Sequence, residues 1–327
     1  MDNQNFKISL VVPAYNEEES IQTFIDTIDK ELASLRDQLE IVFVNDGSRD
    51  RTREVIEDVI TRDPRVTLVN LARNFGKEAA MTAGLFHARG DAVVPMDVDL
   101  QDPPSLIHEF VRLWREEGYD TVYGVRTDRQ ADTPMKRLTA GGFYRMFNAV
   151  STTTRIPENA GDFRLMDRRV VEVIKQLPER NRFMKGLFAW AGFKSIGVPY
   201  ERPARAAGET KFNYWKLWNF ALDGFFSFSS WPLRIWSYVG AGVALLSFIY
   251  MLVIITKVLF FGIDSPGYAS LMCVILFLGG MQLISVGVLG EYLGRMFLEV
   301  KQRPIFVVEG VYGQYQRQDQ TAAQERA

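Results

Sequence analysis

Two long stretches without a charged side chain constrain this 327-residue chain more than any other feature. The first runs from Ile235 to Thr256, and the second runs from Ser265 to Gly290. A helix needs about 20 apolar residues to cross a bilayer, and core helices of soluble proteins rarely stay uncharged for so long. The sequence therefore predicts a hairpin of two transmembrane helices at residues 234–298.

The flanks of these stretches predict an orientation. Arg234 precedes the first stretch, and Arg295 and Lys301 follow the second, whereas the connection Gly262–Gly267 carries no basic side chain. Basic residues concentrate on the cytoplasmic side of membrane proteins. We therefore expect both termini in the cytoplasm, with residues 299–327 as a C-terminal tail.

An aromatic-rich segment, KFNYWKLWNFALDGFFSFSSWP, begins at Lys211 and precedes the hairpin. Aromatic rings mixed with lysines suit the membrane interface, where a side chain can bury its apolar body and keep its polar end in water. We expect residues 211–233 to form interfacial amphipathic helices. A pair of core helices in the soluble part is the alternative.

Residues 1–210 have a different pattern from the C-terminal part, because apolar runs alternate there with amphipathic stretches. The expected strands lie at residues 7–12, 40–45, 66–71, 92–97 and 120–125, and the expected helices at 17–35, 49–60, 77–88 and 103–117. This alternation is typical of βαβ units and predicts an α/β domain with a mostly parallel sheet. The absence of GxGxxG after the first strand and of GxxxxGK[ST] argues against a dinucleotide-binding domain and a P-loop NTPase.

Polar clusters follow three of the expected strands, at Pro13–Glu17, Asn45–Ser48 and Asp97–Asp102. In parallel α/β sheets, ligands bind beyond the carboxyl ends of the strands. We therefore expect these three clusters to converge on one crevice.

The third cluster, DVDLQDPP, has several interpretations. Asp97 and Asp99 are two residues apart, so on an extended strand they would point the same way and repel each other unless a cation lay between them. Oxygen ligands suit Mg²⁺ or Mn²⁺ together with substrate phosphates. A general acid–base pair is one alternative, and a solvated helix start with Asp102 as the cap and Pro103 opening the helix is another. The residues alone do not decide between them.

Other site chemistries have few side chains available. Cys273 is the only cysteine, and His87 and His108 are the only histidines. An intramolecular disulfide, a cysteine-based zinc site and a His-rich metal centre are therefore disfavoured. The formal net charge of −2 gives no global attraction to nucleic acid.

Several motifs together resemble one family. VVPAYNEEESI, VNDGSRDRT, NFGKEAAMTAGL and DVDLQDPP are similar to those of family 2 glycosyltransferases, which have the GT-A nucleotide-sugar fold. GDFRLMDR, ERNRFMKG, RAAGETKF and GVLGEYLGR narrow the resemblance to bacterial polyprenyl-phosphate glycosyltransferases. The most similar subgroup is the bactoprenol glucosyltransferases of O-antigen, or lipopolysaccharide, modification. The resemblance spans residues 7–304.

The resemblance implies an inverting glucosyltransferase at the bacterial inner membrane, with its catalytic domain at residues 1–210 in the cytoplasm. The donor would be UDP-glucose, the acceptor undecaprenyl phosphate, the cofactor Mg²⁺ or Mn²⁺, and the product a β-linked lipid-phosphate sugar. A downstream flippase and a homo-oligomer are further implications, and nucleic acid is not an expected partner.

The resemblance also implies roles for individual residues. Nucleotide-sugar-binding residues would be Pro13, Tyr15, Glu17, Asp46 and Asp97. Metal ligands would be Asp97, Asp99 and Gln101. Catalytic residues would be Asp99, Asp162 and Lys77. Residues that bind the acceptor phosphate would be Arg126, Arg137, Arg205 and Lys211. One departure is Asn45, where many relatives have aspartate, so a charge at that position is in doubt.

Three rival functions are compatible with parts of the pattern. The same reaction could use mannose or 4-amino-4-deoxyarabinose. A processive polysaccharide synthase is disfavoured because the chain has no QxxRW motif. A non-catalytic nucleotide-sugar-binding membrane protein is disfavoured because the aspartates at the expected site are all present.

Overall fold

A computed structural model describes residues 6–127, 160–180, 182–201 and 267–313, together with short helical stretches between residues 238 and 260. Arg137, Arg205 and Lys211, which sequence analysis assigned to the acceptor phosphate, lie outside the described residues. The expected interfacial segment at 211–233 lies outside them too.

The described residues form one eight-stranded sheet with the order β7-β5-β6-β4-β1-β2-β3-β8. The pairs β1–β2, β1–β4, β2–β3 and β5–β7 are parallel, whereas β6 pairs antiparallel with β4 and β5, and β8 pairs antiparallel with β3. The bounds are β1 Ile8–Ala14, β2 Leu39–Asn45, β3 Val66–Leu71, β4 Ala92–Pro95, β5 Thr121–Arg126, β6 Ala160–Asp167, β7 Ser195–Tyr200 and β8 Val308–Gly313. The predicted α/β class with a mostly parallel sheet is confirmed.

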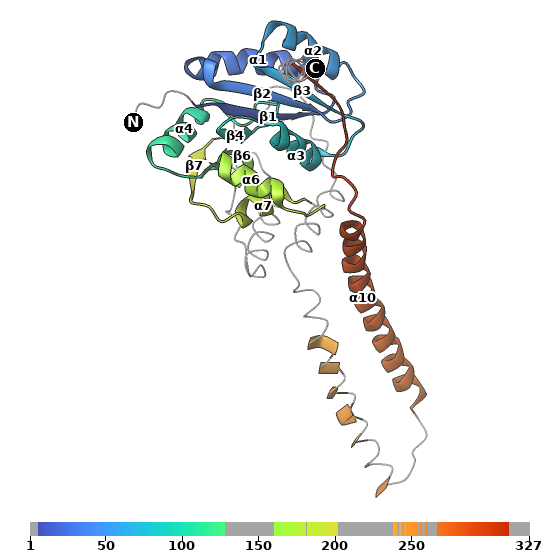
Figure 1. Cartoon of the computed structure of the whole chain (residues 1–327). Helices are drawn as coiled ribbons and strands as arrows, with labels where there is room; N and C mark the ends of the chain where they lie inside the picture. Colours follow the sequence, from blue (N-terminus) through green and yellow to red (C-terminus); the bar gives the residue numbers. More distant parts are fainter. Residues whose placement is uncertain are drawn as a thin grey trace, which may run out of the picture.

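Helices cover both faces of this sheet (Figure 1). Helices α1 (Ser20–Glu31), α2 (Thr52–Arg62) and α4 (Leu106–Glu116) pack on one face, and α3 (Lys77–His87), α6 (Arg168–Gln176) and α7 (Met184–Trp190) pack on the other. The central strands are buried on both sides, which explains why they read as continuous apolar runs rather than as alternating patterns. The predicted helices are confirmed, with α1 shorter than expected because a 3₁₀ turn, η1 (Ala33–Gln38), follows it.

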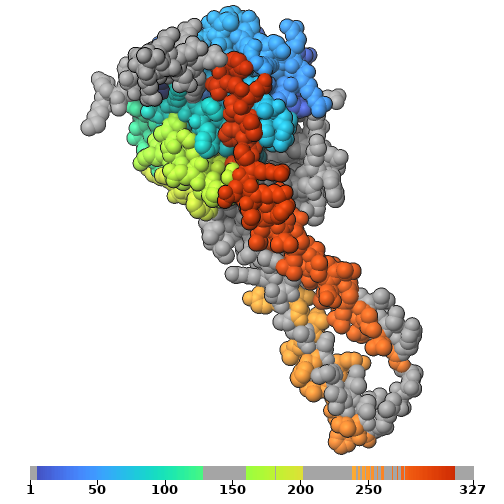
Figure 2. Space-filling model, turned by 45° about the vertical axis from the view of Figure 1, so that its right-hand side comes forward, coloured from blue at the N-terminus to red at the C-terminus, as the bar shows by residue number. Residues whose placement is uncertain are grey.

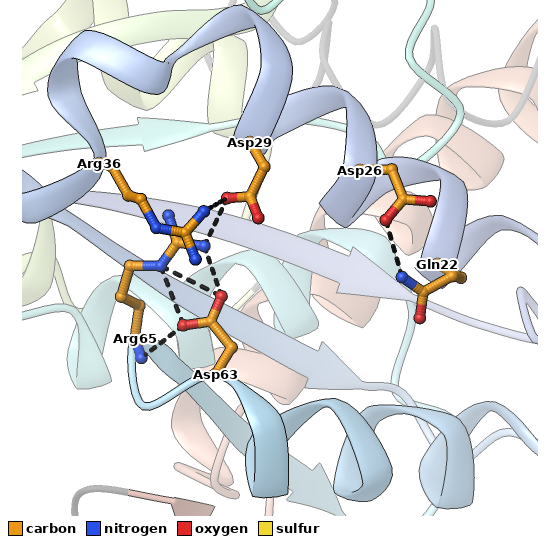
Figure 3. Close-up of polar contacts among 6 residues, drawn as sticks. All are labelled: Gln22, Asp26, Asp29, Arg36, Asp63 and Arg65. Atoms are coloured by element: carbon orange, nitrogen blue, oxygen red, sulfur yellow. Dashed lines mark hydrogen bonds and ion pairs between the residues drawn. The ribbon is translucent and has the colours of Figure 1, made fainter.

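An ionic cluster ties α1 and η1 to the turn between α2 and β3 (Figure 3). Arg65 pairs with Asp63, and its Nη2 lies 2.5 Å from Asp29 Oδ1. Arg36 Nη1 lies 2.6 Å from the same Asp29 oxygen. Arg65 and Asp63 are nearly buried, whereas Arg36 is 49% exposed.

Helix α10 (Tyr268–Val300) projects away from the α/β domain (Figures 1 and 2). At its domain end, Glu299 accepts a hydrogen bond from the Arg180 N–H at 2.9 Å. The chain then returns over the domain, drawn red in Figure 2, and adds β8 to the free edge of β3. Sequence analysis did not predict β8, which lies within the segment assigned to the C-terminal tail.

The expected hairpin of two transmembrane helices is not supported by the described residues. None of the helices among them is both long enough and apolar enough for a bilayer crossing. Several positions of the first uncharged stretch lie outside the described residues. In α10 the uncharged part ends at Gly290, and the charged residues Glu291, Arg295 and Glu299 follow in its last turns.

Candidate functional site

A cavity of about 300 Å³ opens beyond the carboxyl ends of β1, β2 and β4. Its lining comes from the ends of these strands and from the start of α3. The lining residues are Pro13, Ala14, Tyr15, Glu17, Asp46, Asn74, Gly76, Lys77, Ala80, Asp97, Val98 and Asp99. The expected convergence of the three polar clusters is therefore confirmed.

The turn after β1 is shaped by Asn16, whose backbone is left-handed (φ 54°). The Asn16 N–H donates to Ser48 Oγ at 3.0 Å, and the Arg49 N–H donates to Asn16 Oδ1 at 2.8 Å. An asparagine tolerates this conformation better than most residues because its short polar side chain bonds locally. The turn thereby fixes the neighbouring Tyr15 and Glu17 at the cavity wall.

Asp46 holds the loop that leads into α3. The Phe75 N–H donates to Asp46 Oδ1 at 2.7 Å, and the Gly76 N–H donates to Oδ2 at 2.9 Å. Burial raises the pKa of Asp46, although these two N–H groups and the charge of Arg73 act in the opposite direction. Both oxygens of this predicted nucleotide-binding carboxylate therefore already organise the cavity wall.

Asn45 belongs to a hydrogen-bond chain behind the site. Its Nδ2 donates to Asn70 Oδ1 at 2.6 Å, and Asn70 Nδ2 donates to Glu309 Oε2 at 2.6 Å. An aspartate at position 45 would have no N–H to donate and would place its charge against the Asn70 carbonyl oxygen. This chain gives a structural reason for the departure noted in the sequence.

The first three residues of the DVDLQD segment line the cavity, and the next residues turn into the core. Asp97, Val98 and Asp99 all line the cavity, but Val98 is buried, and Leu100 packs on the core with a left-handed backbone (φ 54°). Gln101 is buried and does not line the cavity; its N–H donates to Asp99 Oδ1 at 3.2 Å. The predicted metal set is therefore divided, because the carboxylates of Asp97 and Asp99 line the cavity and the buried Gln101 does not.

Lys77, the first residue of α3, connects two parts of the site. Its Nζ lies 2.6 Å from Asp97 Oδ1 and 3.5 Å from Asp162 Oδ2. Burial by itself would lower the pKa of Lys77, but the carboxylates of Asp97 and Asp162 outweigh it and raise the pKa well above its ordinary value. Lys77 is therefore a fixed positive charge at the cavity.

Asp162, on β6, stands beside a second acid that sequence analysis did not select. Burial would raise the pKa of Asp162, but Lys77, Lys185 and Arg164 lower it. Neighbouring Glu78 has its pKa raised to about 7 by burial and by the charge of Asp162. The pKa is therefore lowered for Asp162 and raised for the neighbouring Glu78.

Asp102 does not cap the following helix, which was one of the alternative interpretations of the DVDLQDPP cluster. The N-terminal cap position of α4 is Ser105, and no side chain caps it. Asp102 instead is buried, accepts a hydrogen bond from Tyr200 Oη, and lies 3.5 Å from Arg126 Nη2. Its charge is matched by Arg126, so burial replaces the solvated helix start that the sequence indicated.

Metal binding has mixed support in this geometry. Within the described ranges, no group of three or more His, Cys, Asp or Glu side chains is arranged to hold a metal ion. Asp97 and Asp99 nevertheless present carboxylate oxygens to one cavity. This donor set suits a hard divalent cation that takes its remaining ligands from phosphates and water.

Sequence analysis missed two residues near the site, Tyr200 and Glu78. Tyr200 reaches Asp102 only because β7 pairs with β5, in a register that places Arg126 opposite Tyr200. Glu78 was overlooked although it follows Lys77 directly within the NFGKEAA motif, and that position was the available signal.

Comparisons with known proteins agree with these observations. Residues 9–175 match the family described as Glycosyl transferase family 2, and residues 231–296 match the GtrB C-terminal hairpin. A bactoprenol glucosyl transferase of Shigella phage SfV is 52% identical over 304 residues, covering 93% of this chain and 98% of that protein. A prophage bactoprenol glucosyl transferase homolog of Escherichia coli strain K12 is 51% identical, covering 93% and 99%.

A protein described as uncharacterized glycosyltransferase sll0501, from Synechocystis, is 53% identical and covers 94% of this chain and 96% of its own length. Among solved structures, glucosyl-3-phosphoglycerate synthase from Mycobacterium tuberculosis, in complex with Mn²⁺, UDP-glucose and phosphoglyceric acid, has a TM-score of 0.43. The two chains are 19% identical, and the match covers 67% of this chain and 77% of that one.

Proposed function

The chain belongs to glycosyl transferase family 2, and from this premise we propose that it transfers glucose from UDP-glucose to undecaprenyl phosphate. The observation that carries the proposal is the convergence of Tyr15, Asp46, Lys77, Asp97 and Asp99 on one cavity at the ends of the parallel strands. The names of relatives more than 50% identical over nearly the whole chain support the choice of glucose and of a bactoprenol acceptor.

The cavity would hold the nucleotide part of the donor. Tyr15 is 42% exposed there and offers a ring face on which a uracil base could stack. Pro13 and Glu17 flank it, and Asp46 keeps the opposite wall in place through Phe75 and Gly76. The diphosphate would then extend toward Lys77.

Asp97 and Asp99 would hold a divalent cation, Mg²⁺ or Mn²⁺, with the donor diphosphate. When bound, such a cation supplies positive charge that stabilises the leaving UDP. Gln101 would support the loop from below through its N–H bond to Asp99.

Lys77 would neutralise negative charge on the departing diphosphate. A fixed cation aimed at developing charge stabilises the transition state without reorganising. Asp97 and Asp162 hold the ammonium from two sides, and its raised pKa keeps it charged at neutral pH. Exchanging one of these carboxylate contacts for a phosphate contact would place Lys77 on the donor.

The reaction itself needs little acid–base catalysis. The acceptor phosphate has a second pKa of about 6 and is largely ionised at neutral pH, so it is already a nucleophile. One of its oxygens forms a bond to the anomeric carbon while the bond from that carbon to the UDP oxygen breaks. Direct displacement inverts the α-linked donor into a β-linked product. Asp162 would orient Lys77 and the sugar, and Arg126 would bind the acceptor phosphate.

We place the enzyme at the cytoplasmic face of the bacterial plasma membrane, held there through residues 211–298. Support comes from the two uncharged stretches and from α10, along which large apolar side chains such as Leu283, Leu293 and Phe297 are more than half exposed. Arg137, Arg205 and Lys211 would meet the acceptor phosphate at this surface. A flippase that receives the glucolipid and a homo-oligomer are further parts of the proposal.

A transfer assay tests the function directly. The purified full chain is incubated with undecaprenyl phosphate, Mg²⁺ or Mn²⁺, and one labelled nucleotide sugar at a time. Label should enter the lipid from UDP-glucose. Transfer only from GDP-mannose, or only from a 4-amino-4-deoxyarabinose donor, would show that the transferred sugar is not glucose. Release of the sugar to water alone would contradict transfer to the lipid.

A variant pair tests the cation site. Asp99→Ala should abolish transfer while the protein still folds and fractionates with membranes, because a carboxylate at the cavity is lost. Asp58→Ala, on the exposed face of α2, is the matched control and should keep full activity. Near-normal transfer activity of Asp99→Ala would exclude the cation role of this residue.

A further inference from the structure

A buried polar chain runs from the aspartate loop to the last residues of two neighbouring strands. Arg126 ends β5 and Tyr200 ends β7, and the parallel register sets the two opposite each other. Arg126 Nε donates to Tyr200 Oη at 3.1 Å, and Tyr200 Oη donates to Asp102 Oδ1. Asp102 and Tyr200 are 5% and 7% exposed, so solvent does not compete for these bonds.

All the hydrogen bonds of this polar chain run in the same direction. The guanidinium donates to the hydroxyl and the hydroxyl donates to the carboxylate, so each bond polarises the next in the same sense. Asp102 also lies 3.5 Å from Arg126 Nη2 and supplies the opposite charge. Asp102 is acceptor-only when ionised, and Tyr200 is the one member of the chain that both accepts and donates.

Two glycines make room for this arrangement. A Cβ on Gly124 would lie 2.7 Å from Tyr200 Cε1, and a Cβ on Gly161 would lie 3.2 Å from Arg126 Nη2. The guanidinium therefore lies against Gly161, the neighbour in sequence of Asp162, whose carboxylate is 3.5 Å from the Nζ of the cavity residue Lys77. The Arg126 side chain stays 31% exposed, so one side of this held cation faces solvent.

We propose that Asp102 and Tyr200 are positioning residues, which hold the Arg126 guanidinium in one orientation at the edge of the cavity so that it receives the acceptor phosphate. An arginine side chain loses much rotamer freedom when it is fixed, and fixing it before the ligand arrives removes that cost from binding. The inference rests on the proposed function, because it takes the ligand of Arg126 to be the lipid phosphate. It also links the segment that carries Asp97 and Asp99 to the acceptor side of the site.

The test compares two hydroxyl deletions in the full chain. Tyr200→Phe removes the bridging hydroxyl and keeps the ring. Tyr123→Phe also removes a hydroxyl from β5, the strand of Arg126, but leaves the hydrogen bonds among Arg126, Tyr200 and Asp102 intact. Tyr200→Phe should raise KM for undecaprenyl phosphate about tenfold, with kcat and KM for UDP-glucose changed less than about twofold. Tyr123→Phe should match the wild type. An unchanged acceptor KM, or an equal rise in both KM values, would overturn the proposal.

A double-mutant cycle shows whether Tyr200 acts through Arg126. If it does, adding Tyr200→Phe to Arg126→Ala should change the acceptor KM by less than about twofold. Multiplicative effects would instead assign Tyr200 an independent role and contradict the proposal.

Equilibrium binding of undecaprenyl phosphate in detergent micelles separates this inference from the proposed function. If the wild type binds the lipid but transfers no glucose, while Tyr200→Phe binds about tenfold more weakly, the proposed reaction fails and the positioning role stands. If the wild type transfers glucose and Tyr200→Phe binds the lipid as tightly as the wild type, the positioning role fails alone. A wild type that does not bind the lipid contradicts both.

Discussion

Gly47 and Gly118 share a left-handed backbone, with φ values of +63° and +66°, but have different surroundings. A Cβ on Gly47 would lie 2.4 Å from the Arg73 carbonyl carbon, whereas a Cβ on Gly118 would meet nothing within 4 Å. Gly118→Ala should therefore cost only backbone strain, about 1–2 kcal/mol. Gly47→Ala must also displace the loop that Asp46 holds, and we expect a loss of about 3 kcal/mol or more.

Thermal and denaturant unfolding of the two variants measures this difference. Gly47→Ala should also raise KM for UDP-glucose, because the displaced loop carries Asn74 and Gly76 of the cavity wall. Equal destabilisation by the two substitutions would show that strain alone, and not the contact with Arg73, decides the choice of glycine at position 47.

Glu78 makes stability depend on pH in the direction opposite to most carboxylates. Its pKa in the folded protein is about 7, above the ordinary 4.5, so the native state holds the proton more tightly than the unfolded chain. The stabilisation is complete below the ordinary pKa and is lost as the pH rises through the folded value. Glu78→Gln, which cannot ionise, should therefore be more stable than the wild type at about pH 8, by about 1–3 kcal/mol.

Unfolding curves at two pH values check this sign. The advantage of Glu78→Gln should shrink or disappear near pH 5, where the wild-type carboxyl is already protonated. An advantage of the same size at both values would point to a packing effect instead of ionisation.

At the scale of elements, the cluster of Asp29, Arg36, Asp63 and Arg65 offers a matched comparison (Figure 3). Arg65→Ala leaves the nearly buried Asp63 carboxylate without its partner and should cost about 3–5 kcal/mol. Arg36 contacts the same Asp29 from a half-exposed position, so Arg36→Ala should cost less than about 1 kcal/mol. Denaturant unfolding at neutral pH measures both values.

The pH dependence of this cluster follows from the carboxylates. Burial would raise the pKa of Asp63, but hydrogen bonds from Arg65 outweigh it and lower the pKa. A depressed carboxyl pKa stabilises the fold above the unfolded value and loses that contribution as the pH falls through the folded value. The difference between the wild type and Arg65→Ala should therefore be largest near neutral pH and should narrow below about pH 4. A gap that is constant across this range would contradict the ionic origin.

Local sequence patterns predict some of these elements but not others. Strands β1 to β4 are continuous apolar runs with helices between them, so their order and the convergence of Asp46, Lys77 and Asp97 followed from local patterns. Strand β6 breaks the apolar pattern because it buries Arg164 and carries Asp162. The contact of Asp102 with Tyr200 depends on strand pairing between segments 98 residues apart, which no local pattern encodes.

At the scale of the whole molecule, β8 fastens the projecting helix to the sheet. It pairs with β3, and Tyr312 Oη accepts a hydrogen bond from Arg53 Nη2 at 2.7 Å. A chain that ends at Val307 would leave the edge of β3 unpaired and Asn70 without Glu309. We expect a lower melting temperature and aggregation from this truncation.

A chain that ends at Gly313 is the control for this truncation. It retains the whole of β8 and lacks only residues 314–327, so its melting temperature should equal that of the full chain. Equal melting temperatures for all three lengths would show that β8 contributes nothing to the stability of the domain.

The position of β8 also has a consequence for the order of events during synthesis. The ribosome makes β1 to β7 first, then the segment that contains α10, and β8 only after both. The edge of β3 therefore stays unpaired until residues 267–300 have emerged, and β8, the last of the described elements, then pairs with it. Completion of the sheet thus becomes a late step that depends on the correct placement of α10, so a nascent chain in which that helix is misplaced keeps an open edge.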